Sequence, residues 1–346
     1  MKKIILTVFG AALLQSVTAQ DLHFTQTTST PLLINPAATG VYDGLERLTI
    51  NHRNQWLGTS TQFMSTAVAA DVNLGKSRTN DRAYAGLGLL FFNDVGGDSN
   101  FGLTQGALSV SGVIPMGRSG HIISAGLQTG IGQRSADINA VTFNSQWGGA
   151  GFDPTIISGE ANSIPSFSYL DASAGLFYQF DGSRSSFARS NDLKVQFGLS
   201  GFHLNAPSLK YSNGLYGEKL NRKFVVHTRV TSEIVGSKWS FDASAAHFIQ
   251  GEQKETIIGL MMRYRFENGT KLTGLAHNAY LSFGSYFRWG DAICPSVAID
   301  WRGFKFGASY DLTVSLLRQV YQGSLEFSLS YTNLHDALFK SKKRRF

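Results

Sequence analysis

The feature that most constrains the fold is a two-residue alternation of apolar and polar side chains near the C-terminus. In residues 304–312, the even positions are Phe, Phe, Ala, Tyr and Leu, whereas the odd positions are Lys, Gly, Ser and Asp. The pattern returns in Ser324–Tyr331. Because successive side chains of a β-strand point to opposite faces, each segment has one apolar and one polar face. Such segments, repeated along a chain, are typical of a barrel with lipid outside and a polar lumen inside.

The alternation repeats from residue 45 onward and predicts about 14 strands of roughly 9–13 residues, the length that a tilted membrane strand requires. Backbone N–H and C=O groups in lipid must all be paired, and strands achieve this only in a closed barrel. We therefore expect an all-β fold, a transmembrane antiparallel β-barrel with a non-strand N-terminal segment. The strands are expected to begin near Leu45, Thr61, Arg82, Phe101, Gly120, Phe167, Asp192, Arg222, Lys238, Lys254, Asn278, Ile293, Phe304 and Gly323.

The first residues have the pattern of a secretory signal peptide. Lys2 and Lys3 precede the apolar run Ile4–Leu14, and small residues follow as far as Ala19. We expect cleavage after Ala19 and export of the mature chain to the outer membrane. Four segments follow from these patterns: a signal peptide (1–19), a periplasmic or lumenal segment whose Pro and Gly residues break strands (20–44), the outer-membrane barrel (45–331) and a basic C-terminal tail (332–346).

The net charge of +7 is concentrated at the two ends of the chain. Two positive charges leave with the signal peptide and a net four lie in the tail, so the barrel itself is nearly neutral. This distribution does not favour nucleic acid. The tail could contact anionic lipid or an acidic partner, or be simply solvated. The single cysteine, Cys294, excludes a disulfide framework. The chain has no G-x-S-x-G elbow, H-E-x-x-H motif, P-loop or metal-ligand cluster, so we expect no cofactor, metal or enzyme activity.

Loop lengths predict the orientation of the barrel. With an even number of strands, both ends of the barrel chain lie on the periplasmic side, and connections after odd-numbered strands face outward. The two longest gaps, Ser135–Ser166 and Asn205–Asn221, follow the fifth and seventh predicted strands. We therefore expect them to be outer loops, available to dock a partner.

Several sequence blocks occur in a fixed order along the chain. The mature start contains Gln20–Gln26 and Leu33–Gly40, and Ile50–Trp56 follows in the first strand. The later blocks are Phe152-Asp153-Pro154, Phe197–Pro207, Phe306–Ser315 and Glu326–Tyr331. Together these blocks resemble the PorP/SprF family of type IX secretion system outer-membrane proteins, and the resemblance spans the whole mature chain.

The resemblance implies a 14-stranded barrel with a non-enzymatic accessory role. Such a protein docks or anchors a secreted or surface-anchored type IX substrate, such as a large adhesin, at the cell surface. The resemblance also implies a periplasmic peptidoglycan-binding partner from the same machine, while outer-membrane lipid surrounds the barrel. Two other hypotheses remain open from the residues: a porin or hydrophobic-solute channel, because Gly-rich inner faces widen a lumen, and a barrel enzyme.

Polar residues of the first strand are candidates for holding an internal plug. Asn51, Arg53 and Gln55 share one face and are expected to point inward, where they either bind the N-terminal segment or simply line the lumen. Asn35-Pro36 fixes a turn in that segment. Trp56 closes the strand and is expected at the membrane interface.

Further candidates lie at the outer rim and on the inner face. His203 ends the seventh strand, where a structural role is favoured because no second metal ligand stands nearby. Asp311 is expected to point inward and to pair with one of the lumenal arginines Arg263, Arg265 or Arg288. The full set of candidate partner-binding or lumen residues is Gln26, Asn35, Pro36, Asn51, Arg53, Gln55, Trp56, Phe152, Asp153, Pro154, His203, Asn205, Pro207 and Asp311.

Overall fold

The computed structural model describes most of the chain. The described residues are 21–56, 62–76, 82–117, 120–137, 140–149, 151–159, 166–185, 193–209, 218–267, 278–315 and 323–334. The expected signal peptide (1–19) lies outside these residues, as does residue 335 onward of the basic tail.

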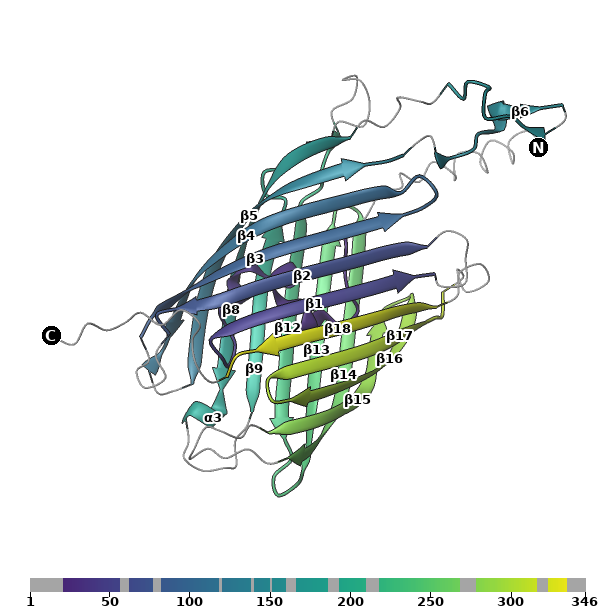
Figure 1. The fold of residues 1–346 in the computed structure, drawn as a ribbon. Coiled ribbons are helices and arrows are strands. Elements are labelled where there is room, and N and C mark those ends of the chain that lie inside the picture. The colour runs from purple at the N-terminus through teal and green to yellow at the C-terminus, as the bar shows by residue number, and fades with distance from the viewer. Residues whose placement is uncertain are drawn as a thin grey trace, which may run out of the picture.

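Antiparallel strands close into a single barrel (Figure 1). Around the barrel the order is β1-β18-β17-β16-β15-β14-β13-β12-β9-β8-β5-β4-β3-β2. The predicted 14-stranded fold is therefore confirmed, and each barrel strand begins within two residues of its predicted start. The strands are β1 (Glu46–Gln55), β2 (Phe63–Leu74), β3 (Tyr84–Gly96), β4 (Phe101–Pro115), β5 (His121–Ser135), β8 (Phe167–Asp181), β9 (Lys194–Phe202), β12 (Lys223–Glu233), β13 (Trp239–Gln250), β14 (Gln253–Glu267), β15 (Ala279–Arg288), β16 (Ala292–Trp301), β17 (Phe304–Thr313) and β18 (Ser324–Thr332).

The two faces of the wall differ in the way the alternation predicts. Outward-pointing side chains such as Leu89, Leu127 and Leu170 are 63%, 69% and 66% exposed and form an apolar surface for lipid. Inward-pointing Ser109 and Ser124 are buried. The seam is closed by pairing the first strand with the last, so the barrel has no free edge in the membrane.

The two mouths of the barrel are also distinct. At one of them, the inner mouth, β1 begins and β18 ends; in outer-membrane barrels this end faces the periplasm. The long connections after β5 and β9 leave from the opposite end, the outer mouth. They contain two small sheets that the sequence did not predict, because two-residue strands carry no periodicity. These sheets pair β6 (Trp147–Gly148) with β7 (Gly151–Phe152), and β10 (Ser208–Leu209) with β11 (Glu218–Lys219).

Residues 21–44, which we term the plug, lie inside the barrel, where Figure 1 shows their purple coils behind the strands. The plug contains η1 (Thr27–Ser29), α2 (Pro31–Ile34) and η2 (Pro36–Ala38). Proline occupies the first position of α2 and of η2, where its missing N–H costs no hydrogen bond. α3 (Gly182–Ser185) lies outside the plug, between β8 and β9. No helix in the described residues is long and apolar enough to span a bilayer.

The plug runs along the lumen from the outer to the inner mouth. Its first described amide, that of Asp21, donates to the side chain of Gln250, the last residue of β13 at the outer mouth. At the other end, the amide of Leu45 donates to the carbonyl of Asn333, just after β18 at the inner mouth. The chain therefore enters its own barrel from the outer mouth and reaches the inner mouth before the first strand begins.

Candidate functional site

A carboxylate on the last strand holds the outer part of the plug. The backbone N–H groups of Thr25 and Gln26 donate to Oε2 and Oε1 of Glu326 at 2.7 and 2.8 Å. Glu326 is fully buried. The side-chain amide of Gln26 also donates to the backbone carbonyl of Glu326 at 3.3 Å. One side chain therefore fixes two successive residues of the plug.

A buried charge cluster lies beside this anchor. The Asp311 carboxylate accepts from Arg53 at 3.1 Å and from Arg288 at 3.0 Å, and all three side chains are at most 6% exposed. Thr25 hydroxyl lies 3.4 Å from Asp311 Oδ1, and the Arg53 guanidinium donates to the carbonyl of His23. Strands β1, β15 and β17 thus supply charges that meet at the plug. Removing one partner of such a cluster leaves a buried charge uncompensated.

The middle of the plug is held by Asn35. Its amide donates to the carbonyl oxygens of Leu176 (2.9 Å) and Leu199 (3.4 Å), while its Oδ1 accepts from the Ala37 amide. The wall is hollowed here to admit backbone. A Cβ at Gly126 would stand 2.6 Å from Ala37 Cα, and one at Gly40 would stand 2.8 Å from Gly86 Cα. The Gly-rich inner face is therefore filled by the plug rather than left open.

Asp71 binds the inner end of the plug. Its Oδ2 accepts from the Gly40 amide and from Arg47, both at 2.8 Å. Gly40 has a φ of 74°, a conformation that costs glycine nothing and strains other residues. The Tyr42 hydroxyl donates to the Asp71 carbonyl at 2.7 Å.

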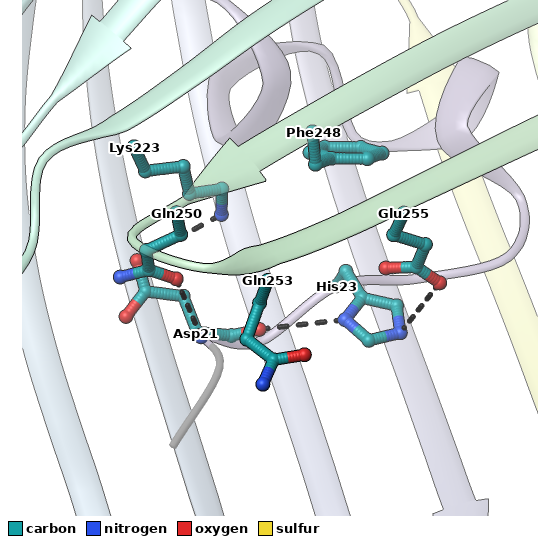
Figure 2. Close-up of a pocket in the computed structure, with 7 residues that line it drawn as sticks. All are labelled: Asp21, His23, Lys223, Phe248, Gln250, Gln253 and Glu255. Atoms are coloured by element: carbon teal, nitrogen blue, oxygen red, sulfur yellow. Dashed lines mark hydrogen bonds and ion pairs between the residues drawn. The ribbon is translucent and has the colours of Figure 1, made fainter. Parts of the chain in front are cut away.

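A second charged group pins the start of the plug at the outer mouth. His203 lies between Asp171, 2.9 Å from Nδ1, and Asp21, 2.5 Å from Nε2. Figure 2 shows the adjoining pocket, in which the His23 imidazole faces Glu255 at 3.1 Å. Lys223 adds a positive charge 3.8 Å from Asp21. Because these groups are partly or fully desolvated, their attraction is weakly screened.

These contacts shift the pKa values of His203 and Asp21, two groups that lie outside the barrel strands. Burial opposes the charged form of His203, but its hydrogen bonds to Asp171 and Asp21 outweigh burial and raise the pKa of the imidazole to about 9. Burial also opposes ionisation of Asp21, yet the hydrogen bond from His203 and the charge of Lys223 hold the pKa of its carboxyl well below the usual range. At neutral pH the pair is therefore charged.

We expect the stability of the barrel to depend on pH through this group. Because the folded pKa of His203 lies above its ordinary value of 6.5, its contribution is complete below about pH 6.5 and is lost as the pH rises through about 9. Asp21 contributes above its ordinary pKa of 3.8 and loses that contribution as the pH falls toward its lowered value. Melting curves should show a larger loss between about pH 7 and pH 10 in wild type than in His203→Gln. Equal losses would contradict this assignment.

An ordered hairpin stands on the outer side of the barrel. The side chain of Gln146 accepts from the Phe143 amide (3.1 Å) and donates to the Ile156 carbonyl (3.1 Å), which braces β6 and β7. Asp153 accepts from the Thr155 amide and hydroxyl, and these bonds lower the pKa of its carboxyl. Trp147 and Phe152 are directly paired and are 63% and 41% exposed, while Ile157 is 85% exposed.

The structure gathers only part of the sequence-predicted set around the plug. Asn51 donates to the Ser29 carbonyl at 3.2 Å, and Arg53 and Asp311 join the charge cluster described above. Of the three arginines proposed for Asp311, Arg288 pairs with it, whereas Arg265 pairs with Glu233 at 3.0 Å. The plug residues that belong to the same group are Gln26, Asn35 and Pro36.

His203 contacts Asp21 at the start of the plug, and the remaining predicted residues lie apart from it. Gln55 is half-buried at the outer end of β1, and Trp56 packs edge-on against Phe63 with ring centroids 4.9 Å apart. Asn205 donates to the Leu170 carbonyl at 2.7 Å, and the carbonyl of buried Pro207 accepts from Leu220, so both shape the outer rim. Phe152, Asp153 and Pro154 belong to the outer hairpin.

Sequence reasoning missed several residues that hold the plug, above all Glu326, Asp171 and Asp21. Glu326 carried a usable signal, since it lies on the serine-rich face of the last predicted strand. Asp171 lies on the corresponding inward face of β8. Asp21 lies in a segment without a repeating pattern and offered no such signal. The same holds for Trp147 of the outer hairpin, which does not touch the plug. Among the described residues, no group of three or more His, Cys, Asp or Glu is arranged to hold a metal ion.

The chain was compared with known protein families, curated proteins and solved structures. A family model described as "Type IX secretion system membrane protein PorP/SprF" matches residues 16–331. A search of curated proteins finds no match to the chain. One similar solved structure is a TodX monoaromatic hydrocarbon channel deltaS2 mutant, with 9% sequence identity and a TM-score of 0.48; the match covers 89% of this chain and 94% of that one. A second is the translocator domain of the autotransporter NalP from Neisseria meningitidis, with 10% identity, a TM-score of 0.43, and coverage of 86% of this chain and 90% of that one. A third is CdiB from Acinetobacter baumannii, with 8% identity, a TM-score of 0.41, and coverage of 84% of this chain and 60% of that one. The chain thus spans three-fifths of the length of CdiB.

Proposed function

Because this chain belongs to the PorP/SprF family of type IX secretion system membrane proteins, we propose that it docks a secreted or surface-anchored substrate at the outer mouth. In this proposal the barrel is a closed, non-enzymatic anchor rather than a conduit. The substrate, a large adhesin in the finest form of the proposal, binds outside. The inner mouth faces a periplasmic peptidoglycan-binding component of the same machine.

The observation that carries the proposal is the outer hairpin. An aromatic pair, Trp147 and Phe152, is exposed on a backbone that is internally hydrogen-bonded and therefore preorganised. Exposed aromatic side chains on a rigid support are the residues that most often dominate binding energy at protein interfaces. The loop 135–166 carries three acidic residues and no Lys or Arg, which favours a partner with a basic rim around an apolar centre.

The plug supports the anchor hypothesis over the channel hypothesis. A porin or hydrophobic-solute channel needs a continuous open path, whereas here the lumen holds a segment fixed at both mouths and in the middle. Opening that path would break the buried contacts of Glu326 and Asp311.

Replacing the aromatic pair should reduce substrate capture. We expect the double variant Trp147→Ser/Phe152→Ser to lower the affinity for the exported substrate by about a thousandfold, because truncating each aromatic anchor costs about 2 kcal/mol and every 1.4 kcal/mol is a factor of about ten. The measurement is quantitative mass spectrometry of proteins captured on the tagged barrel from mild-detergent outer membranes.

A matched control removes exposed apolar surface at the other mouth. Ile234 and Val235, 45% and 77% exposed, lie between β12 and β13 at the inner mouth, so Ile234→Ser/Val235→Ser should leave outer capture unchanged. Unaltered capture by the hairpin variant, with the barrel present at wild-type level, would refute docking through this hairpin.

A further inference from the structure

A polar cavity of about 40 Å³ lies between the plug and the inner mouth. Plug residues Gln26, Thr28 and Ser29 form one side of it, and the inward faces of β12 to β17 form the other. Its wall reaches the inner mouth, because Lys305 is the second residue of β17 and Asp300 the last but one of β16. A cavity of this size holds about three waters, or one small polar group with its hydration.

The charges around this cavity do not balance. Arg229 is matched by Asp242, with Nε 2.9 Å from Oδ1. Lys305 is opposite Asp300 in the strand register. Neither Lys305 nor Arg263 forms an ion pair with any carboxylate of the described residues. The Arg263 guanidinium instead lies over the Tyr280 ring, 4.1 Å from its centroid. Three cations therefore face two carboxylates.

From this imbalance we infer that the cavity takes one carboxylate side chain from a protein segment that enters through the inner mouth. Arg263 supplies a planar set of N–H donors and Lys305 a mobile ammonium, the two groups that best recognise a carboxylate. Buried Ser282 supplies a hydroxyl on the same wall. The narrow volume admits a side chain and excludes a folded domain.

The site rests on the proposed contact with a periplasmic partner, but it is independent of the outer hairpin. An acidic side chain that enters this cavity would touch the plug directly, at Gln26 and Thr28. The ligand class is thus an Asp or Glu residue on a periplasmic protein, presented on a chain thin enough to enter the inner mouth.

The test is isothermal titration of the purified full-length barrel in detergent with an end-blocked pentapeptide, Gly-Ser-Glu-Ser-Gly. We expect this peptide to bind and its Gln counterpart not to bind. Arg263→Gln should raise the Kd about tenfold, the usual loss for one hydrogen bond to a charged group. Asp300→Asn should act in the opposite direction and tighten binding about threefold, because it removes a competing carboxylate.

The matched control is Arg302→Gln, which removes the same charge from an exposed turn at the same mouth and should leave the Kd unchanged. Equal binding of the Glu and Gln peptides, or equal weakening by Arg302→Gln, would overturn the site. Displacement of the peptide by sodium acetate at the same carboxylate concentration would assign the cavity to a free small carboxylate and overturn its assignment to a protein. Because no exported substrate takes part in the titration, its result does not depend on whether the outer hairpin docks a substrate.

Discussion

Deleting residues 23–40 should convert a silent barrel into a conducting one. In planar bilayers, the full-length protein is expected to show no stable conductance, because the plug is fixed at Asp21, Asn35 and Asp71 along the lumen. Without it, a 14-stranded barrel with an inner face of Ser, Gly, Gln and charged residues encloses water and passes ions. This is the largest functional change that the structure predicts for any single alteration.

A second variant guards against a deletion that fails to fold. Gly126→Val deletes no residue and places a branched side chain where Cβ alone would lie 2.6 Å from Ala37 Cα. We expect it to displace the middle of the plug and to produce intermittent conductance in a folded barrel. The outward-facing substitution Gly112→Val, with open space around its Cβ, is the control and should remain silent. A stable ohmic pore from the full-length wild type would instead favour the transport hypothesis.

Asp311→Ala should loosen the plug and destabilise the barrel. The substitution leaves Arg53 and Arg288, 3% and 6% exposed, without their shared carboxylate. Removing one partner of a buried ion pair costs about 3–5 kcal/mol. We therefore expect a clearly lower melting temperature and a plug that no longer seals this part of the lumen.

The single cysteine reports directly on that loosening. Cys294 is fully buried on the inward face of β16. A water-soluble maleimide should label it very slowly in the folded wild type and at least about tenfold faster in Asp311→Ala, in proportion to the population of open plug. Glu252→Ala, at an exposed turn of the outer mouth, is the control and should match wild type. Unchanged labelling and melting in Asp311→Ala would show that the cluster does not hold the plug.

The barrel could be predicted from sequence because its signal is local. A strand repeats every two residues, so segments such as Phe304–Thr313 reveal both their length and their inward face without knowledge of their neighbours. The inward direction of Asn51, Arg53 and Asp311 follows from the same parity. Fourteen such segments, all needing paired backbone in lipid, leave a closed barrel as the solution.

The plug and its anchors could not be predicted to the same degree, because they depend on contacts across the lumen. Arg53 and Asp311 are 258 residues apart, and Thr25 and Glu326 are 301 apart. No periodicity relates such pairs, so Asp311 could be matched to Arg288 only as one of three arginines. The course of the plug from outer to inner mouth is equally non-local, since it is set by Gln250 at one end and by Asp71 at the other.

The most direct test of docking is photo-cross-linking in living cells from a photoreactive residue placed at Phe152, with Val235 at the inner mouth as the matched position. The proposed function predicts an adduct between position 152 and an exported type IX substrate, absent from position 235. Adducts with lipid alone at position 152, or the same substrate at both positions, would contradict docking of the substrate at the outer hairpin.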